Sequence, residues 1–329
     1  MNYAKVELHL HLDGSLNLKW TYDKAKKLLL IDKDMSFEDF YSFMFSRNAK
    51  HTQEGFKKFD ILCDVMQTKE NLIEATYNLV KYLDELGLIY AEIRFASQQH
   101  CKCGLTQLEA LQAVIEGANK AMKECFIKVN IINCLMHKGD SAKFNWNENL
   151  ETIEATKQML NKGACGLDLA GYENNCDFND YAPLFKIAND FNIPFTIHAG
   201  EMGIAEHVID AINMGAKRIG HGVNCINDEK VLQKVIETKI PLEVCVSSNI
   251  KPDYNYASHP FRKLIEEGVV VTLNSDNMIF AKTNVLNEHY QARMLGVNED
   301  QLKKCTINAI NAAFISEEEK KELMEKLTL

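Results

Sequence analysis

Residues 6–15 read V-E-L-H-L-H-L-D-G-S, an apolar run that ends in polar residues and a glycine. This pattern predicts a buried β-strand over 6–12 that is followed directly by a turn. His9 and His11 are two residues apart, so their imidazole groups point to the same face of that strand. The opening segment therefore supplies a strand of the fold and, near the end of that strand, two histidines that could act as ligands or catalytic groups.

Seven further short apolar runs predict strands of the same kind, and several are rich in β-branched residues, as strands buried on both faces are. They lie at 90–95, 127–135, 166–171, 195–199, 218–222, 242–246 and 269–274. Most of the segments between them have the apolar spacing of helices; Leu79, Leu83 and Leu86, for example, precede Gly87, a residue type that commonly ends a helix.

Alternating strands and helices predict a parallel sheet, and eight strands favour a closed (β/α)8 barrel (a TIM barrel) over an open doubly wound sheet. No G-x-G-x-x-G follows a strand, which also argues against a dinucleotide fold. We expect one domain spanning 1–329. Residues 13–88 are too many for one crossover and are expected to hold helices that cover one barrel mouth. Residues 284–329 are expected to form helices outside or below the barrel.

The composition limits which binding partners and which cellular compartment we expect for this protein. The formal charge is −9 and no basic block is present, so we expect neither nucleic acid nor an anionic membrane as a partner. No run of 18 apolar residues is present to cross a bilayer. Most of the ten cysteines lie in apolar runs, as buried thiols of a reducing compartment do, and a strand begins too early for a signal peptide. We therefore expect a cytoplasmic protein, whose oligomeric state the sequence does not fix.

Polar residues gather where four of the predicted strands end. They are H-L-H-L-D-G at 9–14, H-A-G-E at 198–201, G-H-G at 220–222 and N-S-D-N at 274–277. In a barrel these ends converge on one mouth, where active sites lie. His9 and His11 would point inward, where unpartnered imidazoles are costly to bury and a metal removes the cost. With His198 and Asp276 they would form a three-nitrogen, one-carboxylate set that suits one Zn²⁺ per chain.

Each cluster also has an ordinary interpretation when it is taken singly. A lone His-x-His is common on surface strands, and a histidine before a glycine is usually a turn residue. Four clusters at four strand ends of one barrel are hard to explain as turns. The remaining histidines are in helical or loop contexts and are interpreted as structural or surface residues: His51, His100, His137, His207, His259 and His289.

The ordered motifs of the chain resemble those of the adenosine deaminase family of the amidohydrolase superfamily. They run from V-E-L-H-L-H-L-D-G-S at 6–15 through Y-A-E-I-R-F-A at 90–96, G-L-D-L-A-G-Y-E at 166–173, H-A-G-E at 198–201, R-I-G-H-G at 218–222 and E-V-C-V-S-S-N at 243–249 to L-N-S-D-N at 273–277. F-K-K-F-D-I-L at 56–62 is similar to the family's lid segment. The resemblance implies hydrolytic deamination of adenosine and 2′-deoxyadenosine to inosine and 2′-deoxyinosine, a step of purine salvage.

The resemblance also implies roles for individual residues. His9, His11, His198 and Asp276 correspond to zinc ligands, and His11 also borders the substrate. Glu201 corresponds to the acid that protonates purine N1, and His221, beside Asp276, to the residue that orients the attacking water and takes its proton. Gly171 corresponds to the backbone donor to N3, and Asp13 to the ribose contact. The chemistry agrees, because zinc can lower the pKa of bound water to ~7 and burial against a purine favours the protonated form of a glutamate.

Two features bear on the substrate. A carboxylate at Asp13 would repel a 5′-phosphate by about 4 kcal/mol at ~4 Å and an effective dielectric constant of ~20, which favours nucleosides over AMP. Asn277 stands where many family members have a second aspartate, and we expect its amide to donate to purine N7. A sibling deaminase for adenine, a modified adenosine or aminofutalosine stays open, as does a non-enzymatic barrel, although the complete residue set argues against the latter.

Overall fold

The computed structural model describes residues 3–45, 53–173, 177–202, 204–250 and 258–327, with 53–56 as backbone only. All eight predicted strands are present, within a few residues of the expected bounds. They are β1 Lys5–His11, β2 Leu88–Phe95, β3 Lys128–His137, β4 Ala164–Gly171, β5 Thr196–Ala199, β6 Arg218–His221, β7 Leu242–Val244 and β8 Val271–Leu273. Only the ends differ: β3 extends to His137, which the sequence interpretation had placed beyond the strand.

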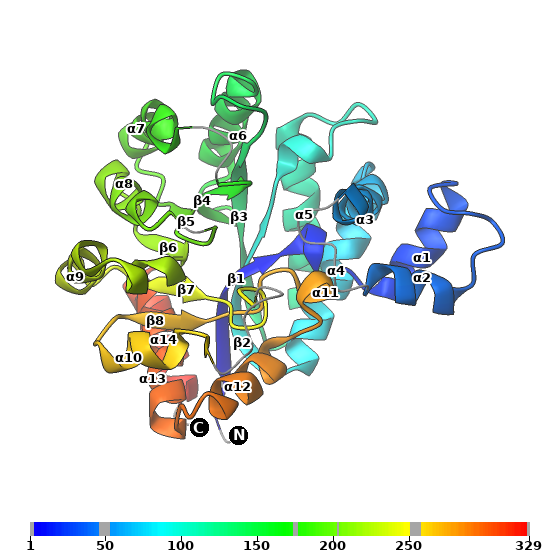
Figure 1. Ribbon diagram of the computed structural model, residues 1–329. Helices are drawn as coiled ribbons and strands as arrows, with labels where there is room; N and C mark the ends of the chain where they lie inside the picture. Colours follow the sequence, from blue (N-terminus) through cyan, green and yellow to red (C-terminus); the bar gives the residue numbers. More distant parts are fainter. Residues whose placement is uncertain (1–2, 46–52, 174–176, 203, 251–257, 328–329) are drawn as a thin grey trace.

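The strands form a (β/α)8 barrel, as predicted (Figure 1). Two parallel four-stranded sheets, β1-β2-β3-β4 and β5-β6-β7-β8, are joined at both edges by parallel bridges between Leu167 and Phe195 and between Leu10 and Asp276. At the second edge, the backbone N–H of Asp276 donates to the oxygen of His9 at 2.9 Å. The residues just after β8 are thereby fixed beside the end of β1.

Helices surround this ring, as Figure 1 shows. Those between the strands are α4 Lys69–Glu85, α5 Gln107–Met122, α6 Trp146–Met159, α7 Ala182–Asp190, α8 Glu206–Met214, α9 Glu229–Thr238 and α10 Phe261–Glu266. Local sequence sets their ends: α5 opens with a capping box between Thr106 and Glu109, and α8 ends at Gly215, whose φ of 100° suits glycine. No helix in the described part of the chain is long and apolar enough to cross a membrane.

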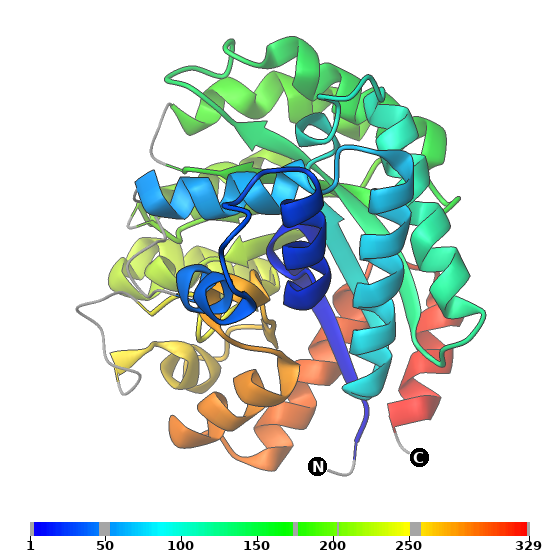
Figure 2. The ribbon, with the colours of Figure 1, turned by 90° about the vertical axis from the view of Figure 1, so that its right-hand side faces the viewer.

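Additional helices lie at the two ends of the barrel. Between β1 and α4 come α1 Leu18–Lys27, α2 Phe37–Met44 and α3 Gln53–Asp64, and α3 contacts the short helix η1 Leu12–Gly14 that directly follows β1. After β8 come α11 Met278–Ala281, α12 Val285–Met294, α13 Glu299–Ala312 and α14 Glu317–Leu327. α13 contacts β1 and β8, and both chain termini lie at the end of the barrel away from α3 (Figure 2).

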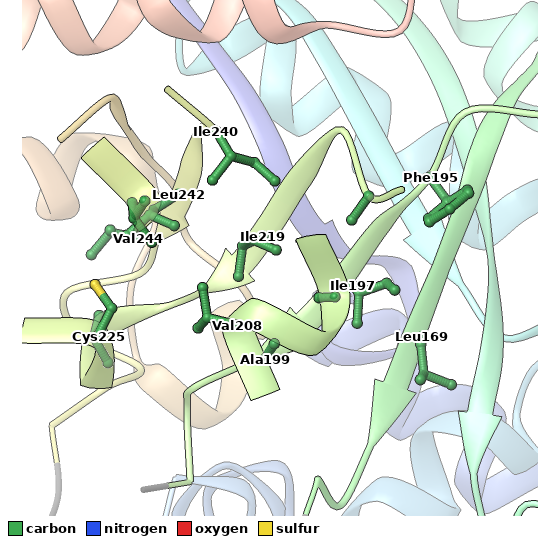
Figure 3. Close-up of a cluster of buried hydrophobic side chains, with 14 of the residues drawn as sticks. Leu169, Phe195, Ile197, Ala199, Val208, Ile219, Cys225, Ile240, Leu242 and Val244 are labelled. Atoms are coloured by element: carbon green, nitrogen blue, oxygen red, sulfur yellow. The ribbon is translucent and has the colours of Figure 1, made fainter. Parts of the chain in front are cut away.

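The two faces of the strands differ in chemistry. Alternate residues such as Ile197, Ile219 and Leu242 point outward and pack against the helices, with Val208 of α8 among their neighbours (Figure 3). The residues between them point inward, and several are charged although they are completely buried: Glu92, Arg94, Asp168, Arg218 and Glu243. The sequence interpretation expected largely apolar strands, so this charged interior is a finding of the structure.

Candidate metal and catalytic site

The four polar strand ends converge at one mouth of the barrel, as the sequence predicted. His9 and His11 come from β1, His198 from β5, His221 from the end of β6, and Asp276 follows β8. All five side chains are at least nine-tenths buried. The ring of His9 lies 4.6 Å from the rings of both His198 and His221, measured between centroids.

The spacing of the donor atoms suits a metal ion. Asp276 Oδ1 lies 3.4 Å from His11 Nε2 and 3.5 Å from His9 Nε2, and the Nε2 atoms of His11 and His198 are 3.4 Å apart. A tetrahedral ion with bonds of ~2.0–2.2 Å would hold its ligands about 3.4 Å apart. His9 Nε2 is buried and has no hydrogen-bond partner in the described part of the chain. These residues therefore fit a divalent metal such as zinc.

His221 also reaches this centre. One ligand atom of His221 lies within 4.8 Å of a ligand atom from each of three residues, and these atoms also lie within 4.8 Å of one another. The three residues are His9, His198 and Asp276. His221 and Ile219 have the same strand parity, which would turn both side chains outward. A φ of 61° at His221 breaks the strand and turns its ring toward the mouth. Such strained backbone is typical of functional sites, and Asp276 has the same φ.

Two buried carboxylates hold the histidines in place, and sequence reasoning assigned neither of them a role. Glu243 Oε2 lies 2.9 Å from His9 Nδ1, and Asp168 Oδ2 lies 2.9 Å from His198 Nδ1. A carboxylate only accepts, so each Nδ1 carries the proton and each Nε2 lone pair points to the centre. Carboxylates commonly orient metal-binding histidines in this way. Both residues occupy strand positions whose side chains point into the barrel, and this alternation could have identified them from the sequence.

Two buried arginines keep these carboxylates ionised. Arg94 binds Asp168 at 2.9 Å and Glu243 at 2.8 Å, and Arg218 binds Glu243 at 2.6 Å and Glu92 at 2.6 Å. Burial alone would raise the pKa of Glu243, but Arg94 and Arg218 outweigh it and hold that pKa well below its usual range. The floor of the site is thus a fixed ionic network of three carboxylates held by two guanidinium groups.

Glu201 and His221 face each other at the mouth. Their Oε2 and Nε2 atoms are 3.6 Å apart, and Asn249 Nδ2 lies 3.0 Å from His221 Nδ1. Asn249 Oδ1 is buried without a hydrogen-bond partner in the described residues, and turning the amide lets Oδ1 accept from Nδ1–H, which leaves the Nε2 lone pair of the neutral ring free to accept a proton. Burial is the main cause that lowers the pKa of His221 to about 3, which keeps this ring neutral.

Glu173 supports the loop that carries Glu201, a role that sequence reasoning missed. Its Oε1 accepts from Gly200 N at 2.6 Å and from His207 Nδ1 at 2.8 Å. Its Oε2 accepts from the backbone N–H groups of Glu201 and Met202, both at 3.0 Å. The carboxylate thus binds three consecutive N–H groups.

The residues predicted to contact substrate lie around the same mouth. Asp13 is buried, with Oδ1 3.9 Å from His11 Nδ1. Gly171 ends β4 with a φ of 116°, and a Cβ there would lie 2.7 Å from the backbone oxygen of His137, so the backbone packing also requires glycine. Asn277 Nδ2 donates to Asp276 Oδ1 at 2.7 Å, which uses one of its two N–H groups.

The histidines outside the predicted site are buried wherever the structure describes them, and His51 lies outside the described residues. His137 is at the end of β3, with its ring 4.4 Å from that of Tyr181. His207 binds Glu173, and its ring stacks on Phe178 at 4.6 Å. His259 Nδ1 accepts from Phe261 N at 3.2 Å. A structural role therefore suits these three better than a surface role.

Solved structures of known proteins share this barrel. An amidohydrolase from Burkholderia ambifaria, with bound zinc, matches with a TM-score of 0.87 and 19% identity, covering 99% of this chain and 90% of that chain. An adenine deaminase from Arthrobacter aurescens matches with a TM-score of 0.87 and 22% identity, covering 99% and 98%. The fold is therefore that of the amidohydrolase barrels.

Sequence comparison defines the family. The family model for adenosine deaminase matches residues 4–328. The adenosine deaminase of Haemophilus ducreyi is 37% identical over 330 residues, which cover 98% of this chain and 95% of that protein. The chain belongs to the adenosine deaminase family, and the resemblance seen in the sequence motifs is confirmed.

Proposed function

We propose that this protein hydrolyses adenosine and 2′-deoxyadenosine to inosine and 2′-deoxyinosine with release of ammonia, using one zinc ion per chain. The observation that carries the proposal is the close approach of the donor atoms of His9, His11, His198 and Asp276, which lie 3.4–3.5 Å apart in successive pairs, beside the facing pair Glu201 and His221. The Haemophilus relative is named an adenosine deaminase, which favours a nucleoside over free adenine.

In this proposal His9, His11, His198 and Asp276 hold the ion. Bound zinc would supply water of lowered pKa at neutral pH. The bound zinc of the Burkholderia structure supports this choice of metal.

The protein's own groups account for the proton transfers. Water adds to purine C6, and the bond from C6 to the amino nitrogen breaks. Protonated Glu201 donates its proton to N1, which makes C6 electron-poor. Neutral His221, beside Asp276, accepts one proton of the attacking water and gives it to the departing amine, and the proton of the new C6 hydroxyl returns to Glu201 as the C6 carbonyl forms. Their 3.6 Å separation supports these acid and base roles on one purine ring.

The remaining contacts would orient the nucleoside. In this proposal the backbone N–H of Gly171 donates to N3, Asp13 binds the ribose 5′-hydroxyl and the free N–H of Asn277 donates to N7. A cleft beside Glu201, lined by Asn224 and Asn249 among others, gives polar surface next to the acid. The buried charge of Asp13 disfavours a 5′-phosphate.

We further infer one domain spanning 1–329, because Asp276 pairs with β1 and α13 packs against it. Helices α1–α3 would serve as a lid, since α3 contacts η1 at the mouth. The cysteines that the structure describes are all free thiols, which supports a reducing cytoplasm.

Replacing His198 with alanine tests the proposal. The variant should lose both stoichiometric zinc, measured by atomic absorption, and conversion of adenosine, followed by ultraviolet absorbance. Lys186→Ala changes an exposed residue and is the matched control. Retention of zinc and near-normal turnover in the His198 variant would contradict the assignment.

A further inference from the structure

A second cluster of ligating side chains lies beside the catalytic mouth. It consists of Asp13 in η1, Cys63 in α3 and His100, which follows the short helix η2 Ser97–Gln99. One ligand atom from each residue lies within 4.8 Å of the other two. Three segments that are far apart in the sequence therefore bring a carboxylate, a thiol and an imidazole to one point.

The three side chains are deeply buried although some of their polar atoms have no hydrogen-bond partner in the described residues. The exposed fractions of Asp13, Cys63 and His100 are 2%, 4% and 0%. Neither ring nitrogen of His100 has a hydrogen-bond partner in the described part of the chain. Burying such polar atoms without partners destabilises the folded protein. A ligand for these atoms would offset the cost.

The donor set indicates the kind of ligand. Nitrogen, sulfur and carboxylate oxygen together suit a borderline-soft divalent cation such as Zn²⁺ or Co²⁺. His100 Nε2 and Asp13 Oδ2 are 3.8 Å apart, slightly wider than the ~3.4 Å expected around a bound ion, so a small inward movement would close the site. Cys63 Sγ now makes a 3.2 Å contact with Gln99 Oε1, which it would exchange for the ion.

We propose that Asp13, Cys63 and His100 form a second, inhibitory site for a borderline-soft divalent cation, separate from the catalytic metal. The ion would take three protein ligands and leave a fourth position for water. Binding displaces the thiol proton of Cys63 to solvent, while His100 binds as the neutral imidazole. Burial raises the pKa of the Cys63 thiol well above its usual range, so binding should strengthen with rising pH.

The inhibitory effect rests on the proposed function. Asp13 is the link between the two sites, because one oxygen faces His100 while the other lies 3.9 Å from His11. An ion held by Asp13 neutralises the carboxylate assigned to the ribose. Losing a hydrogen bond to a charged group should lower kcat/KM for adenosine about tenfold or more. The ion would also tie α3 to the barrel.

Cobalt titration tests the site. The holoenzyme, with its catalytic metal in place, is titrated with Co²⁺ while bound metal, near-ultraviolet absorbance and adenosine turnover are followed. We expect a further equivalent of Co²⁺ to bind, a thiolate-to-cobalt charge-transfer band to grow with it, and turnover to fall in parallel. Absence of that equivalent or of the band in the wild-type protein would overturn the proposal.

Serine and alanine variants at Cys63 identify the thiol. Both should lose the band and the inhibition while keeping the catalytic metal and basal turnover, and the alanine variant serves if serine impairs folding. Cys101→Ser changes a nearby, more exposed thiol and should behave as wild type. A band that persists without the Cys63 thiol would refute the site. Cobalt binding with its band, in a holoenzyme that shows no deamination of adenosine even before cobalt is added, would instead refute the proposed function alone.

Discussion

Replacement of Glu173 by glutamine should impair catalysis although this residue makes no contact with any proposed metal ligand. Each oxygen of the carboxylate accepts two hydrogen bonds: Oε1 from Gly200 N and His207 Nδ1, and Oε2 from Glu201 N and Met202 N. A glutamine places an NH₂ group at one of these positions. With the NH₂ group at the Oε2 position, two backbone N–H donors face a donor; at the Oε1 position, Gly200 N faces a donor while His207 can change tautomer and accept.

The size of the expected loss follows from the number of hydrogen bonds that the substitution removes. Hydrogen bonds to a charged group contribute about 1.5–3 kcal/mol each, so losing two costs up to about 3–6 kcal/mol. Part of this loss destabilises the fold, and part allows the loop that carries Glu201 to leave its position opposite His221. At 1.4 kcal/mol per factor of ten, the upper limit on the fall in kcat is roughly 10²- to 10⁴-fold.

The assay is kcat and KM for adenosine, together with zinc content and urea unfolding, so that turnover can be expressed per folded, metal-loaded molecule. Zinc should stay bound, because Glu173 does not contact the metal cluster. Glu206→Gln changes an exposed glutamate at the start of α8 and should leave all four quantities unchanged. Wild-type kcat and a wild-type unfolding midpoint in Glu173→Gln would refute the reasoning.

Three further substitutions separate the remaining roles. Glu201→Gln should keep its zinc but lose at least ~10²-fold in kcat, since it removes the proposed general acid, and wild-type kcat would assign N1 protonation elsewhere. Asp13→Asn should raise the ratio of AMP to adenosine turnover, because it removes a negative charge near the 5′ oxygen, and an unchanged ratio would contradict the ribose contact. Burial raises the pKa of Glu288 from 4.5 to about 7. The native state therefore keeps this proton after the unfolded state has lost it, and the free energy of unfolding should fall by about 3 kcal/mol as pH rises from about 4.5 to about 7. Urea titrations across that range should show a smaller fall in Glu288→Gln, and identical slopes would refute the assignment.

The sequence predicted the barrel because its signal is local. Each strand is a short apolar run, and β5 and β6 begin and end within a residue of the predicted bounds. The ends of β3 and β8 were less accurate, since pairing with neighbouring strands, which composition does not contain, decides where a strand stops. His137 illustrates the consequence: two more residues of pairing with β4 move it from the expected loop to a strand end.

The histidines and Asp276 could be predicted because parallel strands of a barrel end at one mouth, so position along the chain already implies proximity. The carboxylates and arginines that hold these histidines could not be predicted in this way. Their partners depend on which face of each strand points into the barrel. Glu243 lies between outward-facing Leu242 and Val244, and in a linear reading it looks like an isolated exception to an apolar run. Once the barrel is closed, the same residue joins His9 to two arginines. An acidic residue flanked by apolar ones on a barrel strand therefore indicates a buried ionic contact, and testing inward parity against the predicted metal ligands would have identified Glu243 and Asp168 from the sequence.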